Sequence, residues 1–204
     1  MRKFSILAAL AFASIVAAGT LSAQTDTHKG FYGSAGVGYG AQSLSLTLAD
    51  GDNGGSTASQ ETTWYGQIGL GVKPQWAFGV EFNYMKSGCD ECGGGNTHIT
   101  NSFYSAAATY YTSAKSNFFL KLNLGYAQNQ VAFTGSSSDT EGGFAAGLGF
   151  GYDWALGTGG FIIKPFANYL TQVSSATYSG GGSVSGEKGR AQLLQVGIGI
   201  GYKH

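Results

Sequence analysis

The amino-acid sequence predicts an all-β fold, an eight-stranded antiparallel up-and-down transmembrane β-barrel, on three observations. Charged residues make up 11% of the chain, about half their usual share in a soluble domain. Glycine and aromatic residues are abundant instead, with 35 Gly, 12 Tyr and 13 Phe. Apolar residues also recur at every second position through eight segments, and a period of two is the side-chain period of a β-strand.

Each of the eight segments is close to the roughly ten residues that a tilted strand needs to cross a bilayer. They cover residues 31–39, 64–73, 76–84, 102–111, 118–126, 144–153, 161–171 and 194–203. Between them, no uninterrupted apolar run approaches the ~20 residues of a spanning helix. The segments therefore predict membrane-crossing strands.

The first three segments alternate cleanly, and the tight Pro74-Gln75 turn joins the second to the third. Their apolar sets are the odd positions from Phe31 to Tyr39, the even positions from Trp64 to Val72 and the even positions from Trp76 to Tyr84. The fourth segment is less clear. Tyr104 and Tyr110 favour an outward set at even positions, and the opposite phase stays open.

The fifth, sixth and eighth segments are again regular. Their apolar sets are the even positions from Phe118 to Tyr126, from Phe144 to Tyr152 and from Leu194 to Tyr202. The seventh is mixed, and the odd positions from Phe161 to Tyr169 are the favoured outward set. The opposite set of most segments is rich in glycine, which suits the inner wall of a narrow barrel.

Charge is absent from all the apolar sets. Lys73, Glu81, Lys121 and Asp153 fall in the opposite sets. A charge that faces lipid at mid-depth costs about 2–4 kcal/mol, so this partition is what a membrane barrel requires. The alternative, a soluble β-sandwich, would have a polar and charged second face, whereas here that face is mostly glycine. A closed sheet also satisfies every backbone group in lipid.

The connections alternate in length. Short turns lie near Pro74, Ser113 and Leu156, and long polar connections span residues 49–61, 87–99, 131–141 and 174–189. Outer-membrane barrels place their short turns in the periplasm and their long loops outside. We expect the same orientation here.

The N-terminal residues have the pattern of a secretory signal peptide. Arg2 and Lys3 precede a mainly apolar run from Phe4 to Gly19, and Ala23 ends a small-residue cleavage site. A membrane anchor is the alternative, but the run is shorter than the ~20 residues of a spanning helix. We predict a signal peptide at 1–23, an N-terminal segment at 24–29 and a barrel domain at 30–204.

Two sequence features frame this domain. Gly30-Phe31-Tyr32-Gly33 opens the first strand, and Val196 to His204 reads VGIGIGYKH. With the eight segments between them, they resemble the small outer-membrane β-barrel domain family of the OmpA, OmpX and opacity-protein type. The resemblance implies an outer-membrane location, contact with outer-membrane lipid, and recognition of the last strand by the barrel assembly machinery. His204 stands where most such strands have Phe.

Eight strands enclose an interior that side chains nearly fill, so a large pore is not expected. Unpaired charges in such a lumen would be costly, which predicts that Glu81 and Lys121 pair. The candidate lumen polar network consists of Lys73, Glu81, Asn83, Lys121, Asn123 and Asp153.

Cys89 and Cys92 form the one chemically distinctive loop motif, Cys89-Asp90-Glu91-Cys92. In an exported protein such cysteines most often pair, so we predict a disulfide. Free thiols are one alternative. A metal site is another, with Asp90, Glu91 and His98 as further candidates, but structural zinc needs four ordered ligands. We assign no metal or cofactor.

The histidines, His28, His98 and His204, are not placed beside a nucleophile on a strand, so no catalytic triad is predicted. The GxGxG runs have no following helix, which argues against nucleotide binding. With its near balance of charge the chain has no basic character to favour nucleic acid as a partner. We expect a non-enzymatic structural barrel that presents surface loops. Loop-mediated adhesion or binding of an external ligand, or a narrow porin-like channel, are the alternatives.

Overall fold

The computed structural model describes residues 28–47, 53–88, 98–132, 139–174, 176–177 and 188–204. Its strands are β1 (Gly30–Thr47), β2 (Asn53–Lys73), β3 (Trp76–Gly88), β4 (His98–Tyr111), β5 (Phe118–Ala132), β6 (Asp139–Tyr152), β7 (Trp154–Ala155), β8 (Phe161–Gln172), β9 (Ala176–Thr177) and β10 (Lys188–Lys203). The predicted signal peptide, most of the predicted segment 24–29, and both cysteines lie outside the described residues. In the described part of the chain, no helix is long and apolar enough to cross a membrane.

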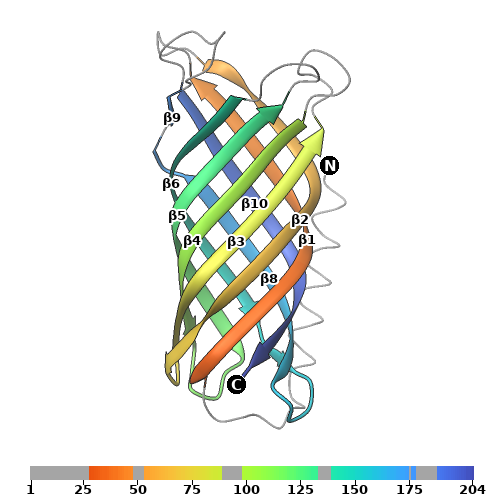
Figure 1. The fold of residues 1–204 in the computed structure, drawn as a ribbon, viewed down its shortest axis with the longest axis vertical. Coiled ribbons are helices and arrows are strands. Elements are labelled where there is room, and N and C mark those ends of the chain that lie inside the picture. The colour runs from red at the N-terminus through yellow and green to blue at the C-terminus, as the bar shows by residue number, and fades with distance from the viewer. Residues whose placement is uncertain (1–27, 48–52, 89–97, 133–138, 175, 178–187) are drawn as a thin grey trace.

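Eight of the strands close into a ring, which confirms the predicted fold class. Consecutive long strands pair antiparallel from β1 to β6, and β6 then pairs with β8 and β8 with β10. The register from Tyr32↔Lys203 to Thr47↔Lys188 joins β10 to β1 and closes the barrel. The strands wind obliquely around its axis (Figure 1). The two-residue strands β7 and β9 extend the sheet only locally, beside β8 and β10.

The inward and outward sets follow the sequence alternation. Outward Ile200 is 67% exposed and outward Leu148 is 63% exposed, whereas inward Phe166 and Leu193 are fully buried. Tyr104 on β4 is exposed and Phe103 is buried, which confirms the favoured phase of the fourth segment. In the seventh segment Phe166 is buried and Tyr169 is exposed, which confirms the favoured outward set at odd positions.

The barrel has two unlike ends. The short connections 74–75, 112–117 and 153–160 lie at one end, which we call the short-turn end, together with the start of β1 and the end of β10 (Figure 1). At the opposite end, which we call the long-loop end, β1, β3 and β5 end at Thr47, Gly88 and Ala132, and β2, β4 and β6 begin at Asn53, His98 and Asp139. The connections therefore alternate between the two ends as predicted, but their lengths do not alternate regularly: five residues separate β1 from β2 and six separate β5 from β6, whereas eight separate β6 from β8.

The predicted long connections were too wide. β2 begins at Asn53, so residues 53–61 are strand rather than loop, and β3, β4, β5, β6 and β10 also continue into the predicted connections. The ladder persists there because backbone hydrogen bonding to a neighbouring strand needs no apolar side chain. Leu46↔Gly55 and Leu46↔Gly189 show this on both sides of β1.

Candidate functional site

The inward side chains of the eight long strands meet inside the barrel, and their chemistry changes along its axis. From the short-turn end upward we distinguish a charged cluster, a central polar network, an apolar layer and an amide cluster. The order along β3 illustrates this: Glu81 and Asn83 are followed by Met85 and then by Ser87, and all four are buried.

A buried ion pair is the centre of the polar network. Lys121 Nζ on β5 lies 2.5 Å from Glu81 Oε2 on β3, and their side chains are 1% and 0% exposed. Asn83 and Asn123 donate to Glu81 Oε1 at 2.9 and 2.7 Å. Both carboxylate oxygens therefore have partners, as a buried pair requires to offset the loss of hydration.

The central network extends around the barrel wall. Asn168 Nδ2 on β8 donates to Asn83 Oδ1 at 3.4 Å and to Gln195 Oε1 at 3.3 Å. Gln195 on β10 in turn donates to Thr63 Oγ1 on β2 at 2.8 Å. The hydrogen bonds of this network thus tie together strands that are not neighbours in the sheet.

The charged cluster at the short-turn end is built around Asp153. Lys203 Nζ lies 2.5 Å from Asp153 Oδ2 and Lys164 Nζ lies 3.6 Å from Asp153 Oδ1. The Tyr111 hydroxyl donates to Asp153 Oδ2 at 2.6 Å. Lys164 also donates to Gln67 Oε1 at 3.4 Å, which links the cluster to the tyrosines of β1 and β2.

An apolar layer separates the central network from the long-loop end. It comprises Met85, Phe103, Ala127, Ala145, Leu170, Ala191 and Leu193. Each of these residues is at most 5% exposed, although every one faces the lumen. Beyond the layer lies the amide cluster, in which Gln42 contacts Ser87 and Asn101, and Asn129 donates to Gln172 Oε1 at 2.9 Å.

The structure places the predicted network residues in different surroundings. Glu81, Asn83, Lys121 and Asn123 lie together, whereas Asp153 belongs to the charged cluster. Lys73 was wrongly assigned to the lumen. It is exposed at the end of β2, where the register shift between Gly71 and Lys73 interrupts the alternation.

Sequence reasoning missed three members of the charged cluster: Tyr111, Lys164 and Lys203. Lys164 and Lys203 are inward in the phases predicted for their strands, so the alternation alone was enough to select them.

His28 was considered only as a catalytic candidate. Its ring nitrogens contact Ser116 O and Lys203 Nζ, which is not a base beside a nucleophile. Within the described ranges, no three His, Cys, Asp or Glu side chains gather as metal ligands would.

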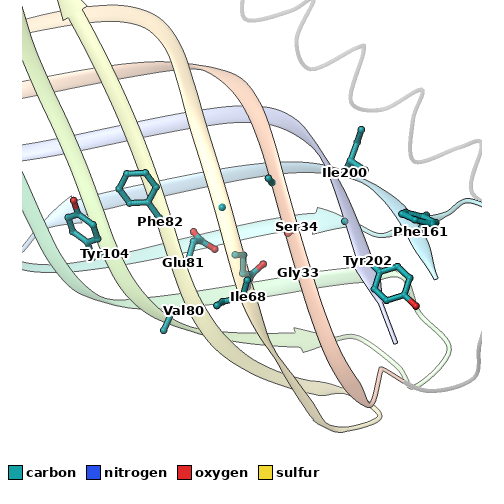
Figure 2. A pocket seen from close by; sticks show the side chains of 14 residues that line it. Gly33, Ser34, Ile68, Val80, Glu81, Phe82, Tyr104, Phe161, Ile200 and Tyr202 are labelled. Carbon is teal, nitrogen blue, oxygen red and sulfur yellow. The ribbon is translucent and has the colours of Figure 1, made fainter. Parts of the chain in front are cut away.

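The outer wall carries a hollow of about 700 Å³ that residues of β1, β2 and β3 help to line (Figure 2). Small residues of β1 and β2, among them Gly33, Ala35 and Gly66, line it together with outward apolar side chains such as Ile68 and Phe82. The polar residues along it, Ser34, Gln67 and Glu81, have their side-chain partners in the lumen. The hollow therefore offers mainly apolar contact.

Comparisons with known proteins agree with this architecture. The model of the autotransporter beta-domain family matches residues 47–204. Neisserial surface protein A is similar with a TM-score of 0.54 at 16% identity, over 85% of this chain and 97% of that one. The outer membrane protein OprG from Pseudomonas aeruginosa has a TM-score of 0.50 at 18% identity, over 89% and 99%.

The outer membrane protein AlkL, solved in lipid bilayers, has a TM-score of 0.51 at 14% identity, over 91% of this chain and 96% of that one. No curated protein matches the chain significantly. The predicted resemblance to small eight-stranded outer-membrane barrels is confirmed as a resemblance of fold. The matching family model belongs to a different but related group of barrels.

Proposed function

The chain belongs to the autotransporter beta-domain family, and from this premise we propose that it is an integral outer-membrane protein with a structural, loop-presenting role. In this proposal its apolar outer face contacts outer-membrane lipid, and the assembly machinery that inserts outer-membrane barrels is its partner during biogenesis. The lumen serves to hold the wall together and conducts neither solutes nor a polypeptide.

The filled lumen is the observation that carries this proposal. The Glu81–Lys121 pair and its amide partners occupy the middle of the barrel, and the apolar layer lies across the same lumen. An apolar constriction blocks ions because water does not stay in it. A route through this lumen would have to displace both, which favours a structural role over transport.

Planar-bilayer recording of the refolded protein tests the proposal. We expect the wild-type chain to show no steady conductance. Phe103→Ala and Leu193→Ala remove two large side chains from the apolar layer, and combined with Glu81→Ala and Lys121→Ala, which open the central network, they are expected to produce small, reproducible current steps. Leu148→Ala, on the outward face, is the matched control and should stay silent. Steady ohmic steps from folded wild-type protein would contradict the closed lumen.

A second candidate function, binding of an external ligand, is favoured by the length of the strands. β1 remains paired with β2 and β10 as far as Thr47, well beyond the outward aromatic residues Tyr39 and Trp64. The chain there is rich in Ser, Thr and Gln. A paired stem of this kind holds a loop at a defined height and angle above the membrane.

Shortening this stem separates the two functions. Ser43 and Ala58 are directly opposite each other, so residues 44–57 can be replaced by an Asn-Gly turn without changing the register below. We expect the barrel to fold, as judged by its gel mobility before and after heating. If the stem binds a ligand, cells that display the shortened chain lose attachment to surfaces or to one another. Unchanged attachment would remove this second candidate.

A further inference from the structure

The residues that precede β1 turn into the short-turn mouth of the barrel. Gly30 has a φ of +104°, a conformation that residues with side chains rarely adopt. The carbonyl group of His28 lies where a Cβ atom on Gly71 of β2 would stand. Glycine at these two positions allows the chain to bend and to pack directly against the barrel wall.

His28 is the side chain that docks this segment. Its ring stacks on Tyr111 of β4, with ring centroids 3.5 Å apart and an interplanar angle of 2°. Nε2 lies 2.9 Å from the carbonyl oxygen of Ser116 and therefore carries the hydrogen and donates it. Nδ1 lies 3.1 Å from Lys203 Nζ and accepts from it. These partners select the neutral ring with its proton on Nε2.

The docked segment borders a cavity of about 440 Å³ at this mouth. Its lining includes His28, Lys29, Tyr111, Lys203 and His204. The cavity lies on the short-turn side of the charged cluster. Residues 28–29 therefore lie between the cluster and the compartment that this end of the barrel faces.

The charges around His28 oppose its protonation. Lys203 is the cation closest to the His28 ring, and Lys29 follows His28 in the chain. The Asp153 charge favours protonation of His28, but Asp153 is already paired with Lys203 at 2.5 Å and with Lys164 at 3.6 Å. A protonated ring would place an N–H group against the Lys203 ammonium and lose the hydrogen bond that Nδ1 accepts.

We propose that His28 is a proton-operated latch, which holds residues 28–29 across the short-turn mouth when its ring is neutral and releases them when the ring is protonated. Release opens the cavity and exposes the charged cluster to solvent. The apolar layer stays in place, so the latch controls access to the lower lumen and not passage through the barrel. The inference goes beyond the structural role proposed above.

The direction of the pH dependence follows from linkage. Burial, together with the Lys203 charge, lowers the pKa of His28 from 6.5 to about 4. The docked state thus disfavours protonation, and docking is at full strength above pH 6.5. Docking weakens as the pH falls through this window and reaches its minimum below about 4. The two pKa values correspond to a loss on the order of 100-fold in the docking equilibrium.

Nuclear magnetic resonance of ¹⁵N-histidine in the refolded full chain tests the latch. We expect the His28 ring nitrogens to keep the neutral pattern at pH 6 and to change near pH 4. Ring-to-ring nuclear Overhauser contacts between His28 and Tyr111 should disappear over the same range. A His28 that titrates near 6.5, or contacts that survive its protonation, would overturn the proposal.

Two variants separate the latch from general acid unfolding of the mouth. His28→Phe can still stack on Tyr111 but cannot take a proton, so its ring contacts should persist at pH 3. Lys203→Met removes the nearest positive charge and should raise the His28 midpoint. Loss of the ring contacts in His28→Phe at pH 3 would show that acid opens the mouth without His28, and would also overturn the proposal.

Discussion

Replacing either partner of the central ion pair is expected to destabilise the barrel strongly. Glu81→Gln leaves Lys121 without a counter-charge, and Lys121→Met leaves the Glu81 carboxylate unpaired. Both side chains are at most 1% exposed. Removing one partner of a buried pair costs about 3–5 kcal/mol, because the remaining charge is neither hydrated nor neutralised. Equilibrium unfolding by urea in lipid, followed by tryptophan fluorescence, measures this loss.

The double variant Glu81→Gln, Lys121→Met is the control. Its glutamine oxygen can still accept from Asn83 and Asn123, and no charge is left unpaired, so most of the stability should return. A different result would have a clear meaning. If each single variant lost about 1 kcal/mol or less, the pair would behave as a solvated surface ion pair, and the lumen would be open to water.

Leu122→Arg is the second substitution with a large expected effect. Leu122 lies outward near the middle of the part of β5 that the sequence predicts to cross the membrane, and it is 48% exposed. An arginine that faces lipid at the bilayer midplane costs about 2–4 kcal/mol. Equilibrium unfolding in lipid vesicles measures the loss as a shift of the urea midpoint at constant slope.

Thr62→Arg is the matched control for this prediction. Thr62 is also outward and exposed, but it lies beyond Trp64 on the long-loop side of β2. Near the membrane interface the same residue costs about 0–1 kcal/mol. Equal losses at both positions would mean that the outward face of β5 is not surrounded by hydrocarbon.

The alternation alone was sufficient to predict the number of long strands and the face of most residues in them; Lys73, beyond the register shift of β2, is the exception. The prediction succeeded because outward positions must be apolar to contact lipid, whereas the inward positions between them must be small or polar to fit a narrow lumen. In the fourth segment aromatic residues occupy both faces, since Tyr104 is outward and Phe103 and Tyr111 are buried, which is why the alternation left its phase open. The strand ends at the long-loop side were not predictable in this way. Above the membrane, both faces of residues 53–61 are polar, so the alternation that marks a strand disappears.

The partners inside the lumen were harder to predict than the strands. The Glu81–Lys121 ion pair was predictable because both residues are inward on their strands and carry opposite charges. The surroundings of Asp153 depend on the height at which β4, β8 and β10 cross the barrel, which is set by register and tilt and not by sequence spacing. The apolar layer was missed because Phe103 lies in the inward phase of its strand, and because Met85 and Leu193 lie just outside the predicted segments 76–84 and 194–203. In the sequence they look like exceptions, and only closure of the sheet brings them together.

We expect one face of the alternating strands to contact hydrocarbon while the other lines a closed lumen. Spin labels at Leu120, Leu122 and Leu124, in a background with Cys89→Ser and Cys92→Ser, test it most directly. Collision rates with oxygen and with a water-soluble nickel chelate report depth, and Thr62 serves as the shallow reference. We expect oxygen access to be highest and nickel access to be lowest at Leu122. Nickel access at Leu122 equal to that at Thr62 would contradict it.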